Sequence, residues 1–565
     1  MKRFCTLLFT LISISSISQN YISPFDFPLL LSGTFGELRS NHFHTGIDIK
    51  TESVEGKEIR SIADGYISRI KVSTWGYGKV IYIVHPETGH TSVYAHMQIF
   101  NDKIKKIINE QQYKKESFEI NYYPARNTLL VKQGDVIGLS GNSGGSGGPH
   151  LHFEIRDTKT EHTLNPLSFG FEVDDNINPV LSEIKIYTHN NSIINNKNKD
   201  LRISLKKDEE GYLLNNNSEI TVHGDISFGI STIDRQNGAP NNKNGVYAIK
   251  LFIDDNMIHH FEVDELNFSE KRFINSHIDY GCYINQSIKF NRCYTLPYNK
   301  LSNYKKNINK GIVNFTDSLL HKIRFEVSDI KGNTSTLNFN IQSKESKNKF
   351  NKTEQDDQFI YNQENIYSSL NFEAHLERYS LYENCDISYS ETPRTNNTLS
   401  EIHNFMNKNI PLHKEYVVSI KSDIPNNLKD KVYIAQVRDD GTFKYKGKTW
   451  KDGNLLAKTR EFGSFTIIAD TLNPIISNYN FTYNTNDNYS GNISVKISDN
   501  ESGISFYRGE IDGKWILMEY DFKTNLLVYY IEREKLKKGE HTLKVVVKDK
   551  LNNETTFMQN FTTDF

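Results

Sequence analysis

The sequence predicts an all-β protein, in which a small antiparallel β domain with one inserted helix precedes two or three β-sandwich modules. The 565 residues include 31 Tyr and 33 Phe, which favour strands, although hydrophobic residues make up only 37%. Short alternating apolar stretches between glycine- and asparagine-rich turns are typical of antiparallel sheets with one solvated face. At about 150 residues per domain, this length predicts about four domains.

Charge and hydropathy exclude two classes of protein. The formal net charge is −2, from 67 Lys and Arg against 69 Asp and Glu, so no basic excess marks a nucleic-acid binder. Only one apolar stretch approaches membrane length, and it lies at the N-terminus. The chain is therefore not expected to cross a membrane several times.

The N-terminus has the pattern of a secretory signal peptide, which we predict for residues 1–18. Met1 to Arg3 is basic, Cys5 to Ile17 is mostly apolar, and small residues stand at Ser16 and Ser18. An uncleaved anchor helix is the alternative. Because no later segment could stop transfer, we expect a periplasmic or secreted protein without a membrane span after cleavage.

Glycine turns separate short strands between Ile59 and Val84. Asp64-Gly65 predicts a hairpin between strands at 60–63 and 66–70, and Gly76-Tyr77-Gly78 predicts a turn before a strand at 80–84. Between Asn101 and Lys115, isoleucines recur at helical spacing, with an aspartate near the start and lysines near the end. This stretch predicts the one inserted helix.

A repeat organises the rest of the chain. Residues 175–180 resemble 470–475, and residues 321–329 resemble 541–549, with an asparagine four residues after each second segment. These copies predict β-sandwich modules at 175–342 and 469–565, and their pattern resembles that of bacterial immunoglobulin-like modules. Residues 343–358 are polar and predict a linker, and residues 359–468 hold further strands, as in a third β module.

Three cysteines follow the predicted signal peptide: Cys282, Cys293 and Cys385. An odd number cannot pair fully within one chain. Cys282 and Cys293 could bridge neighbouring strands in an oxidising compartment, and three free buried thiols are the alternative. The chain has no Cys-x-x-Cys pair, so it does not predict a cysteine zinc site.

The residues that could carry chemistry lie in three segments, at 44–48, 94–97 and 148–154. A catalytic zinc takes three protein ligands, commonly two imidazoles and one carboxylate, and leaves one position open. His44, Asp48 and His152 supply that set. With 18 His in the chain, one His-x-His spacing is weak evidence, so the hypothesis depends on all three segments meeting in one domain.

Residues 150–153 alternate His-Leu-His-Phe, which predicts a strand with both imidazoles on one face. If His152 binds the metal, His150 lies about 6–7 Å along that face, close enough to move a proton on water or substrate. His96, from another strand, could take a matching role, because imidazole titrates near neutral pH.

These segments resemble the lysostaphin/LytM-type zinc metalloendopeptidases of metallopeptidase family 23, which cut peptide cross-bridges in bacterial cell walls. The resemblance runs from about Leu31 to Leu167 and implies a zinc metallopeptidase domain over residues 24–172. It is carried by Gly33-Thr34-Phe35-Gly36, by Ile62-Ala63-Asp64-Gly65, by the stretch 132–144, by Gly148-Pro149-His150-Leu151-His152-Phe153-Glu154, and by Asn165-Pro166-Leu167.

By this resemblance, His44, Asp48 and His152 correspond to the ligands of one Zn²⁺, and His96 and His150 correspond to the catalytic histidines. The implied function is hydrolysis of peptide bonds in peptidoglycan stem peptides or cross-links, by a water molecule that the zinc activates. The implied fold is a small antiparallel β domain with the metal on the floor of a groove walled by loops.

The sequence departs from the family pattern in two places. The segment Gln98–Arg126 is longer than the usual connection, so it either covers the groove and regulates access or packs on one edge. Gly147 stands where the family often has threonine, which should change a loop and leave the metal ligands in place.

Other polar residues near the three segments have simpler interpretations. His42 could reach the same strand face as His44 but lacks its spacing to Asp48, and His85 and His90 flank a turn and are expected in solvent. Glu154 follows His152 on one face and could accept a hydrogen bond from it, although a solvated side chain is the favoured interpretation. Tyr94 either shares the groove face or packs in the core.

Two further functions compete with hydrolysis. One is a non-catalytic protein of the same fold that binds cell wall or activates another hydrolase, although such relatives typically lack metal ligands and all five positions are filled here. The other is an adhesion or scaffold protein whose C-terminal β modules bind a partner protein or a glycan. The expected partners of the N-terminal domain are peptidoglycan peptides, and none is a nucleic acid.

Overall fold

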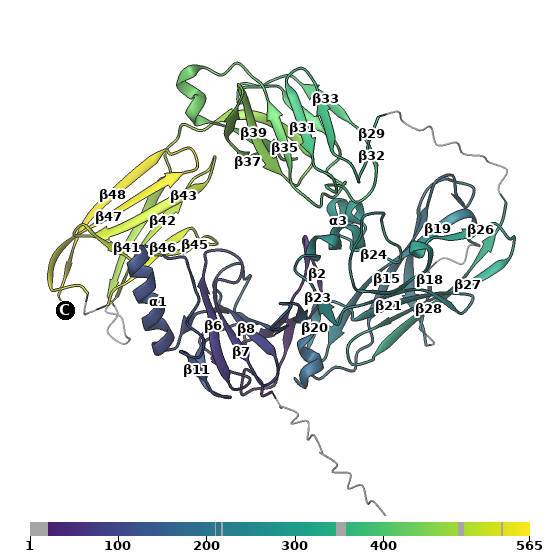
Figure 1. Cartoon of the computed structure of the whole chain (residues 1–565), viewed down its shortest axis with the longest axis horizontal. Helices are drawn as coiled ribbons and strands as arrows, with labels where there is room; N and C mark the ends of the chain where they lie inside the picture. The colour runs from purple at the N-terminus through teal and green to yellow at the C-terminus, as the bar shows by residue number, and fades with distance from the viewer. Residues whose placement is uncertain are drawn as a thin grey trace, which may run out of the picture.

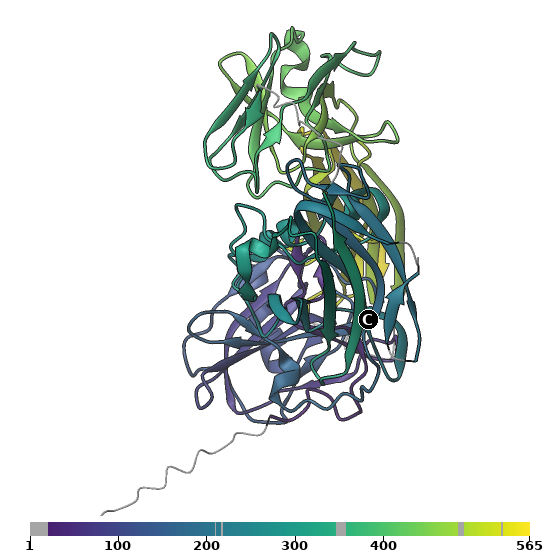
Figure 2. The same cartoon turned by 90° about the vertical axis from the view of Figure 1, so that its right-hand side faces the viewer.

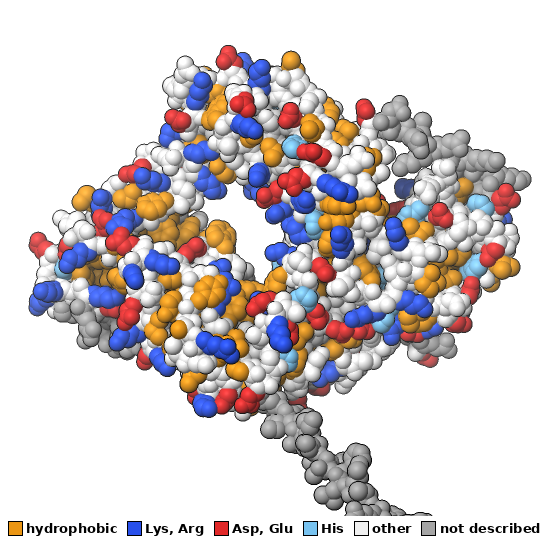
Figure 3. Space-filling model, in the orientation of Figure 1, with side chains coloured by type: hydrophobic (Ala, Val, Ile, Leu, Met, Phe, Trp, Pro, Cys, Tyr) orange, Lys and Arg blue, Asp and Glu red, His pale blue; other side chains and the backbone are white. Residues whose placement is uncertain are grey.

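The computed structural model describes residues 21–209, 211–215, 219–345, 357–483, 491–532 and 535–564. The predicted signal peptide and residues 346–356 of the predicted linker lie outside these ranges. Figure 1 shows four β units arranged in a ring, in chain order from the N-terminal domain at the bottom, and Figure 3 shows an opening through the middle of the ring. In Figure 2 the third unit stands at the top, on the side opposite the N-terminal domain.

The prediction of an all-β chain with one inserted helix near the start is confirmed. Four separate hydrophobic cores occupy the N-terminal domain (21–173), the first module (174–345), the middle module (357–470) and the last module (471–564). Two short helices of the first module, α2 (Ile274–His277) and α3 (Tyr280–Gln286), add to the predicted helix. No helix within the described residues is long and apolar enough to span a membrane.

The N-terminal domain is built on one antiparallel sheet with short strands at its margins. The path of the sheet is β1 (Leu31–Gly33), β4 (Ile47–Lys50), β13 (His150–Asp157), β8 (His90–Met97), β7 (Lys79–His85), β6 (Gly65–Val72) and β10 (Ile120–Tyr122), with β11 (Leu130–Val131) beside β6 and β14 (Thr163–Leu164) beside β13. Strand β14 also pairs with β23 (Glu265–Leu266) of the first module. The two units are therefore joined by a shared sheet edge as well as by the chain.

The hairpin predicted at Asp64-Gly65 does not form. Strand β5 (Glu58–Arg60) ends earlier and pairs with β12 (Val136–Leu139) in a separate small sheet, which β9 (Ile99–Phe100) completes. Asp64 instead accepts hydrogen bonds from Lys132 Nζ and from the Gln133 backbone. The chain bends at residues 62–64, but the strand after the bend enters a different sheet from the strand before it. The second predicted turn does join paired strands, β6 and β7.

The inserted helix forms where the isoleucine spacing predicted it, as α1 (Asp102–Lys115). The Asn101 side chain caps its first turn by accepting a hydrogen bond from the Ile104 backbone at 3.0 Å. Ile104 and Ile108 face the core, and Glu116 ends the helix in the left-handed conformation. Short β2 (Leu38–Arg39) and β3 (His42–Phe43) form a separate hairpin before β4.

The first module is one large, strongly bent sheet whose inner side chains form a single core. Its path is β16 (Ile193–Ile194), β19 (Thr221–Gln236), β15 (Val180–Thr188), β17 (Leu201–Lys207), β18 (Tyr212–Leu214), β28 (Thr334–Ser343), β27 (Leu320–Ser328), β21 (Ala248–Ile253), β22 (Asn256–Glu262) and β25 (Tyr304–Asn307), with β20 (Ala239–Asn244), β24 (Asn291–Arg292) and β26 (Val313–Phe315) against β19. The long strand β19 also meets β28 in parallel, so the sheet closes on itself.

The middle and last modules each have two main sheets, and in the middle module β29 (Gln358–Phe359) and β32 (Cys385–Asp386) form a further two-stranded pair. In the middle module the main sheets are β30 (Asn365–Ser368), β31 (Phe372–Leu376), β35 (Tyr416–Ile420), β39 (Asn454–Thr459) and β38 (Thr449–Lys451), and β33 (Tyr389–Thr392), β34 (Ile402–Phe405), β40 (Gly463–Ala469), β36 (Val432–Val437) and β37 (Phe443–Gly447). In the last module they are β41 (Ile475–Tyr483), β42 (Gly491–Ser498), β46 (Leu526–Tyr530) and β45 (Glu519–Asp521), and β44 (Lys514–Ile516), β43 (Ile504–Ile511), β47 (Gly539–Asp549) and β48 (Glu554–Thr563).

The sequence repeat corresponds to a repeated set of hydrogen bonds. In the first module the Asn333 side chain donates to the Asp175 carbonyl at 3.2 Å and to the Asp329 carboxylate at 2.7 Å. In the last module the Asn553 side chain makes the same two bonds, to the Asp470 carbonyl at 3.1 Å and to the Asp549 carboxylate at 2.6 Å. Each asparagine therefore ties the last hairpin of its module to the segment that enters the module.

The disulfide alternative for Cys282 and Cys293 is wrong for this structure. All three described cysteines are free, and two of them are buried. Cys282 lies on α3, whereas Cys293 lies beyond the end of β24 in the core of the first module, where burial raises the pKa of its thiol. The alternative predicted three free, buried thiols. All three thiols are free, but only Cys282 and Cys293 are buried, and Cys385 is half-buried.

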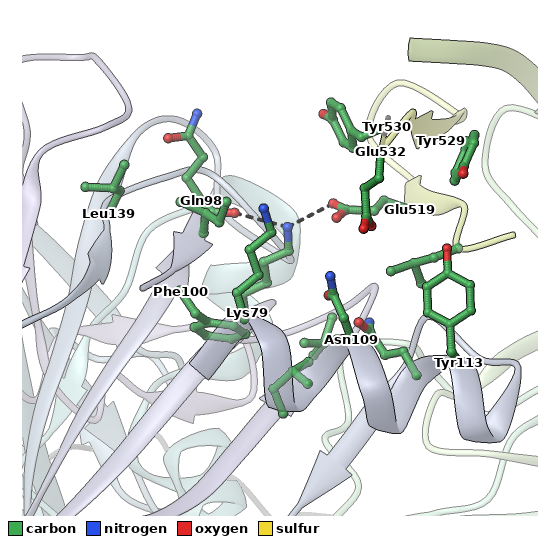
Figure 4. Close-up of a pocket in the computed structure, with 16 residues that line it drawn as sticks. Lys79, Gln98, Phe100, Asn109, Tyr113, Leu139, Glu519, Tyr529, Tyr530 and Glu532 are labelled. Atoms are coloured by element: carbon green, nitrogen blue, oxygen red, sulfur yellow. Dashed lines mark hydrogen bonds and ion pairs between the residues drawn. The ribbon is translucent and has the colours of Figure 1, made fainter. Parts of the chain in front are cut away.

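The inserted helix forms the contact that closes the ring. Tyr113 on α1 meets Trp515 of the last module edge to face, with ring centroids 5.1 Å apart, and Glu116 pairs with Arg508 at 2.7 Å. A cavity of about 540 Å³ lies between α1 and the last module (Figure 4). At its edge Lys79 Nζ donates to Glu519 at 2.9 Å and to the Gln98 carbonyl at 3.0 Å. These contacts pack α1 against the last module.

A second contact of the last module lies close to the three sequence segments. Phe522, in the turn between β45 and β46, packs on Trp75 with ring centroids 3.6 Å apart. The neighbouring Lys523 donates to the carbonyls of Asn142 and Ser146 in the glycine-rich stretch that leads to β13. The last module therefore holds this loop of the N-terminal domain from outside.

Phe522→Ala should loosen this contact without unfolding either unit. An aromatic pair contributes about 0.5–1.5 kcal/mol beyond its buried area. We expect backbone amides in residues 72–79 and 141–148 to exchange with deuterium faster in the variant. Met558→Ala, an exposed position on β48 of the same module, is the matched control and should leave exchange unchanged. Equal exchange in both variants would show that the contact does not hold the loop.

Candidate active site

Two neighbouring strands bring together Asp48 and His152, which are 104 residues apart in the sequence. In the antiparallel pairing of β4 and β13, Asp48 lies directly opposite His152. Cross-strand partners project from the same face, so both side chains point to one side of the sheet. His44, just before β4, reaches the same point. All three are buried, with 2%, 5% and 3% of His44, Asp48 and His152 exposed.

Three atoms of these side chains face a common point. The distances are 3.0 Å from His44 Nε2 to Asp48 Oδ1, 3.0 Å from His44 Nε2 to His152 Nδ1, and 2.9 Å from His152 Nδ1 to Asp48 Oδ1. Ligand atoms about 2.0–2.1 Å from a tetrahedral Zn²⁺ lie about 3.3 Å apart, so a small outward movement would accommodate the ion. Two other groups of three acidic side chains among the described residues could hold a metal, but neither contains an imidazole.

The second nitrogen of each imidazole determines what the first can do. His44 Nδ1 lies 2.8 Å from the Thr34 carbonyl, which can only accept a hydrogen bond. Nδ1 therefore carries the proton, and Nε2 presents a lone pair to the common point. Burial supports this neutral form, because it lowers the pKa of His44 to about 4 against the opposing effect of Asp48.

His152 is oriented by a carboxylate behind it. Its Nε2 lies 3.0 Å from Glu154 Oε1, so Nε2 donates and Nδ1 faces the common point. Burial lowers the pKa of His152, but hydrogen bonds to Asp48 and Glu154 outweigh it and raise the pKa to about 9. Without a metal, Nδ1 therefore keeps a proton that it shares with Asp48. A metal ion bound there would displace this proton.

His150 and His96 lie at the mouth of the site with their Nε2 atoms available. His150 Nδ1 donates to the Gly148 carbonyl at 2.9 Å, and its Nε2 is 3.5 Å from Asp48 Oδ1. His96 Nδ1 donates to the Ser143 carbonyl at 2.9 Å, and burial lowers the pKa of His96 to about 3. The two ring centroids are 4.8 Å apart. All five side chains that the sequence analysis singled out therefore converge.

The backbone at His96 is held in an unusual conformation by two interlocked loops. Its φ is 61°, in the left-handed region that costs free energy for any residue other than glycine. The His96 amide donates to the Tyr77 carbonyl at 3.0 Å, in the loop between β6 and β7. The glycine-rich loop that accepts from the His96 ring is tied to the same region, because the Gly145 amide donates to the Gly76 carbonyl at 2.7 Å.

Arg39 is a site residue that the sequence analysis did not find. Its guanidinium donates to Asp48 Oδ2 at 2.5 Å, which leaves Oδ1 for the common point. Burial raises the pKa of Asp48, but the surrounding histidines hold it well below its usual range. Gly33 makes this pair possible, since a Cβ there would lie 2.6 Å from Arg39 Nη2 and 2.8 Å from Asp48 Oδ2. No local pattern around Arg39 indicates this long-range partner.

Glu154 is buried, and the favoured interpretation of a solvated side chain is wrong. Its Oε1 accepts hydrogen bonds from Thr45 at 2.6 Å and from the Tyr77 hydroxyl, and its Oε2 accepts from Arg156 at 2.5 and 2.7 Å. Strand β13 is covered on both faces, so alternation along it does not lead to solvent. The same-face spacing from His152 was the signal that could have identified Glu154.

The remaining polar neighbours lie outside the cluster. His42 is exposed and bonds the Ser40 carbonyl. His85 is fully buried instead of solvated, because it bonds the Asp64 carbonyl and the Ser92 hydroxyl. His90 is half-buried and bonds the Tyr21 hydroxyl at 2.7 Å. Tyr94 packs in the core, and its hydroxyl accepts from the Ile62 amide.

Comparison with known proteins places this site in a family. Residues 42–117 and 118–166 match the model of peptidase family M23, and residues 356–470 match the model of a Zu5-like domain. Over 131 residues the chain is 34% identical to the DD-carboxypeptidase/endopeptidase Mpg of Neisseria meningitidis. The matched residues make up 23% of this chain and 24% of that protein. Over 111 residues it is 30% identical to the glycyl-glycine endopeptidase ALE-1 of Staphylococcus capitis. The matched residues make up 20% of this chain and 24% of that protein.

A solved structure also resembles part of the chain. The catalytic domain of lysostaphin from Staphylococcus simulans is 22% identical and covers 24% of this chain and 87% of that one, with a TM-score of 0.18. The family match makes residues 42–166 a peptidase domain of family M23. The chain spans about a quarter of the length of the curated relatives it matches.

Proposed function

We propose that the protein is a secreted, zinc-dependent endopeptidase that hydrolyses peptide bonds in peptidoglycan stem peptides or cross-links. One observation carries the proposal: two imidazole nitrogens and a carboxylate oxygen lie within 3.0 Å of one another, each oriented by a hydrogen bond from behind. Two imidazoles and one carboxylate are a common ligand set of catalytic zinc. His44, Asp48 and His152 would hold the ion.

Zinc bound there would polarise the scissile carbonyl and lower the pKa of a water molecule toward neutrality. The protein's own contribution to proton transfer comes from His96 and His150. Their Nδ1 atoms donate to fixed carbonyls, so each Nε2 offers a lone pair toward the site. One can accept a proton from the attacking water, and the other, once protonated, can donate to the oxygen that gains charge.

Two observations support the proposed substrate class: the names of the relatives and the small residues beside His150. Both curated relatives are named as endopeptidases, one of them for glycyl-glycine bonds. The wall beside His150 consists of small residues from Ser143 to Gly148, and a Cβ added at Gly147 or Gly148 would meet no atom within 4 Å. An extended peptide backbone can approach closely along such a wall.

Purified peptidoglycan treated with the full-length protein and with His152→Ala tests the proposal. The wild type should contain one zinc ion per peptidase domain and release muropeptides whose masses identify the bond cut. His152→Ala should lose both zinc and hydrolysis. His42→Ala is the matched control, because this exposed histidine lies two residues from His44 and outside the cluster. Equal digestion by wild type and His152→Ala would overturn the zinc mechanism.

The same experiment separates hydrolysis from a purely binding function. A non-catalytic wall-binding protein would retain wall affinity in both variants and release no muropeptides from either. The β modules behind the peptidase domain are the candidate binding surfaces for wall, glycan or a partner protein. A cell-wall pull-down with full-length protein and with a variant truncated after residue 173 would assign wall binding to one part or the other.

A further inference from the structure

A second cluster of acidic side chains lies where the peptidase domain joins the first module. Asp175, Asp234 and Asp329 each offer a carboxylate oxygen, and the three oxygens lie within 4.8 Å of one another. They come from three segments, the entry to β15, strand β19 and the end of β27. Asp234 is 2% exposed and Asp329 is 4% exposed.

Protein donors only partly compensate these charges. Asp329 accepts two hydrogen bonds from Asn333, at 2.9 and 2.7 Å, and Asp175 accepts one from the Ile177 amide at 3.1 Å. Asp234 Oδ1 has no hydrogen-bond partner. Burial and the neighbouring carboxylates raise the pKa of Asp234 to about 8, and burial raises that of Asp175 to about 6 despite nearby Lys331. The cluster therefore has a deficit of positive charge.

An independent observation points to a ligand here: two buried amide oxygens beside the cluster lack hydrogen-bond partners. Gln236 and Asn244 are each 2% exposed, and neither Gln236 Oε1 nor Asn244 Oδ1 has a hydrogen-bond partner. The Gln236 side chain hydrogen-bonds the Asp175 carboxylate, which places it at the cluster. Asn244 lies directly opposite Asp234 in the pairing of β19 and β20, so the two share a face. Buried polar atoms without partners are rare in native structures and need an explanation.

We propose that these side chains form a Ca²⁺ site. Three carboxylates with amide oxygens beside them supply the all-oxygen ligand set that Ca²⁺ takes, in the flexible geometry that it tolerates. The cluster contains no imidazole or thiolate, so it does not favour zinc or another softer ion. A divalent ion would neutralise most of the buried negative charge and give the unpartnered oxygens a ligand.

The position of the site indicates what the ion would hold together. The hairpin of β19 and β20, which carries Asp234, Gln236 and Asn244, lies against the peptidase domain. Asn242 in this hairpin donates to the Leu31 carbonyl at 2.8 Å, and the Gly245 amide donates to the Thr34 hydroxyl at 3.0 Å. The ion would tie this hairpin to the connection between the two units and to the last strands of the module.

The last module contains a corresponding cluster of three aspartates, whose carboxylates accept more hydrogen bonds from backbone amides. Asp470, Asp499 and Asp549 also lie within 4.8 Å, but backbone amides satisfy them more fully. Asp499 accepts from the Gly503 amide at 2.6 Å, and Asp470 accepts from the Ser502 amide at 3.1 Å. The proposal therefore concerns the first cluster, where the unpartnered amide oxygens are.

Calorimetric titration of Ca²⁺ into the zinc-loaded full-length protein, with thermal unfolding of the same samples, tests the site. The variants are Asp234→Asn and, as a matched loss of charge, Glu209→Gln, an exposed residue of the same module. Wild type and Glu209→Gln should each take up one more equivalent of Ca²⁺ than Asp234→Asn. Millimolar Ca²⁺ should raise the Tm of the first two more than that of Asp234→Asn.

Thermal unfolding without Ca²⁺ shows whether the substitution itself destabilises the protein. Asp234→Asn should unfold at the same temperature as the wild type or a higher one, because a neutral amide replaces a carboxyl group whose charged form is disfavoured by burial and by the neighbouring carboxylates. Three results would overturn the proposal: no Ca²⁺ uptake by the wild type, unchanged uptake in Asp234→Asn, or Mg²⁺ uptake with the same affinity as Ca²⁺. Each is independent of peptidase activity.

Discussion

Glu154→Gln should lower the affinity of the peptidase domain for zinc by about 10–100-fold, the usual effect of losing the group that orients a ligating histidine. It should also lower the free energy of unfolding by about 3–5 kcal/mol, because it breaks a buried ion pair. Glu154 is fully buried, and its Oε1 holds His152 Nε2 at 3.0 Å. An amide in its place leaves the Arg156 guanidinium, itself 6% exposed, without its buried anionic partner.

Glu161→Gln is the matched control for this prediction. Glu161 also pairs with Arg156, at 3.3 Å, but 61% of its side chain is exposed, and such pairs contribute about 0–1 kcal/mol. Zinc affinity is measured by competition with a chromogenic chelator, and stability by urea unfolding of the metal-free proteins. If Glu154→Gln behaves like Glu161→Gln in both measurements, Glu154 neither orients His152 nor neutralises Arg156.

The local pattern of the sequence, together with the family resemblance, singled out the residues that converge. Strand alternation placed His150 and His152 on one face, and the four-residue spacing linked His44 with Asp48. The convergence itself follows from the pairing of β4 with β13, which sets Asp48 opposite His152. These positions could be predicted because each lies in a short segment whose residue types are unusual together.

The partners behind the site could not be predicted in the same way. Arg39 reaches Asp48 only because a separate hairpin folds over Gly33, and no sequence spacing encodes that approach. Glu154 was placed in solvent because alternation was interpreted as if one face of β13 were wet, whereas both faces are covered. A charged side chain in a two-sided strand needs a buried partner, and Arg156, two residues later, is that partner.

The same limit explains the misplaced hairpin and the role of the insertion. The chain does bend just before Gly65, but β5 pairs with β12 from far along the chain, and local turn chemistry does not specify such pairing. The amphipathic pattern of α1 predicted a helix with one buried face. It could not predict that Tyr113 and Glu116 would contact a module about 400 residues away.

Gly144→Ala should reduce kcat/KM for peptidoglycan peptides by about 100-fold or more, because small displacements of catalytic groups have effects of that size. Gly144 has a φ of +71°, and a Cβ there would lie 2.3 Å from the Gly78 amide and 2.5 Å from the Gly76 carbonyl. Both obstacles are backbone atoms, so one of the two interlocked loops must move. Either movement displaces His96, since one loop binds its ring and the other its amide.

Gly147→Ala separates this effect from a general sensitivity of the loop. Gly147 lies three residues further along the same loop, does not have a positive φ, and has open space where a Cβ would stand. Its substitution should leave kcat/KM within about twofold of the wild type, since nothing near it needs to move. Zinc content should stay the same in both variants, because none of the three proposed ligands lies on either loop. Loss of activity with retained zinc in Gly144→Ala alone would therefore assign the defect to the position of His96. Equal losses in both variants, or loss of zinc from Gly144→Ala, would contradict that assignment.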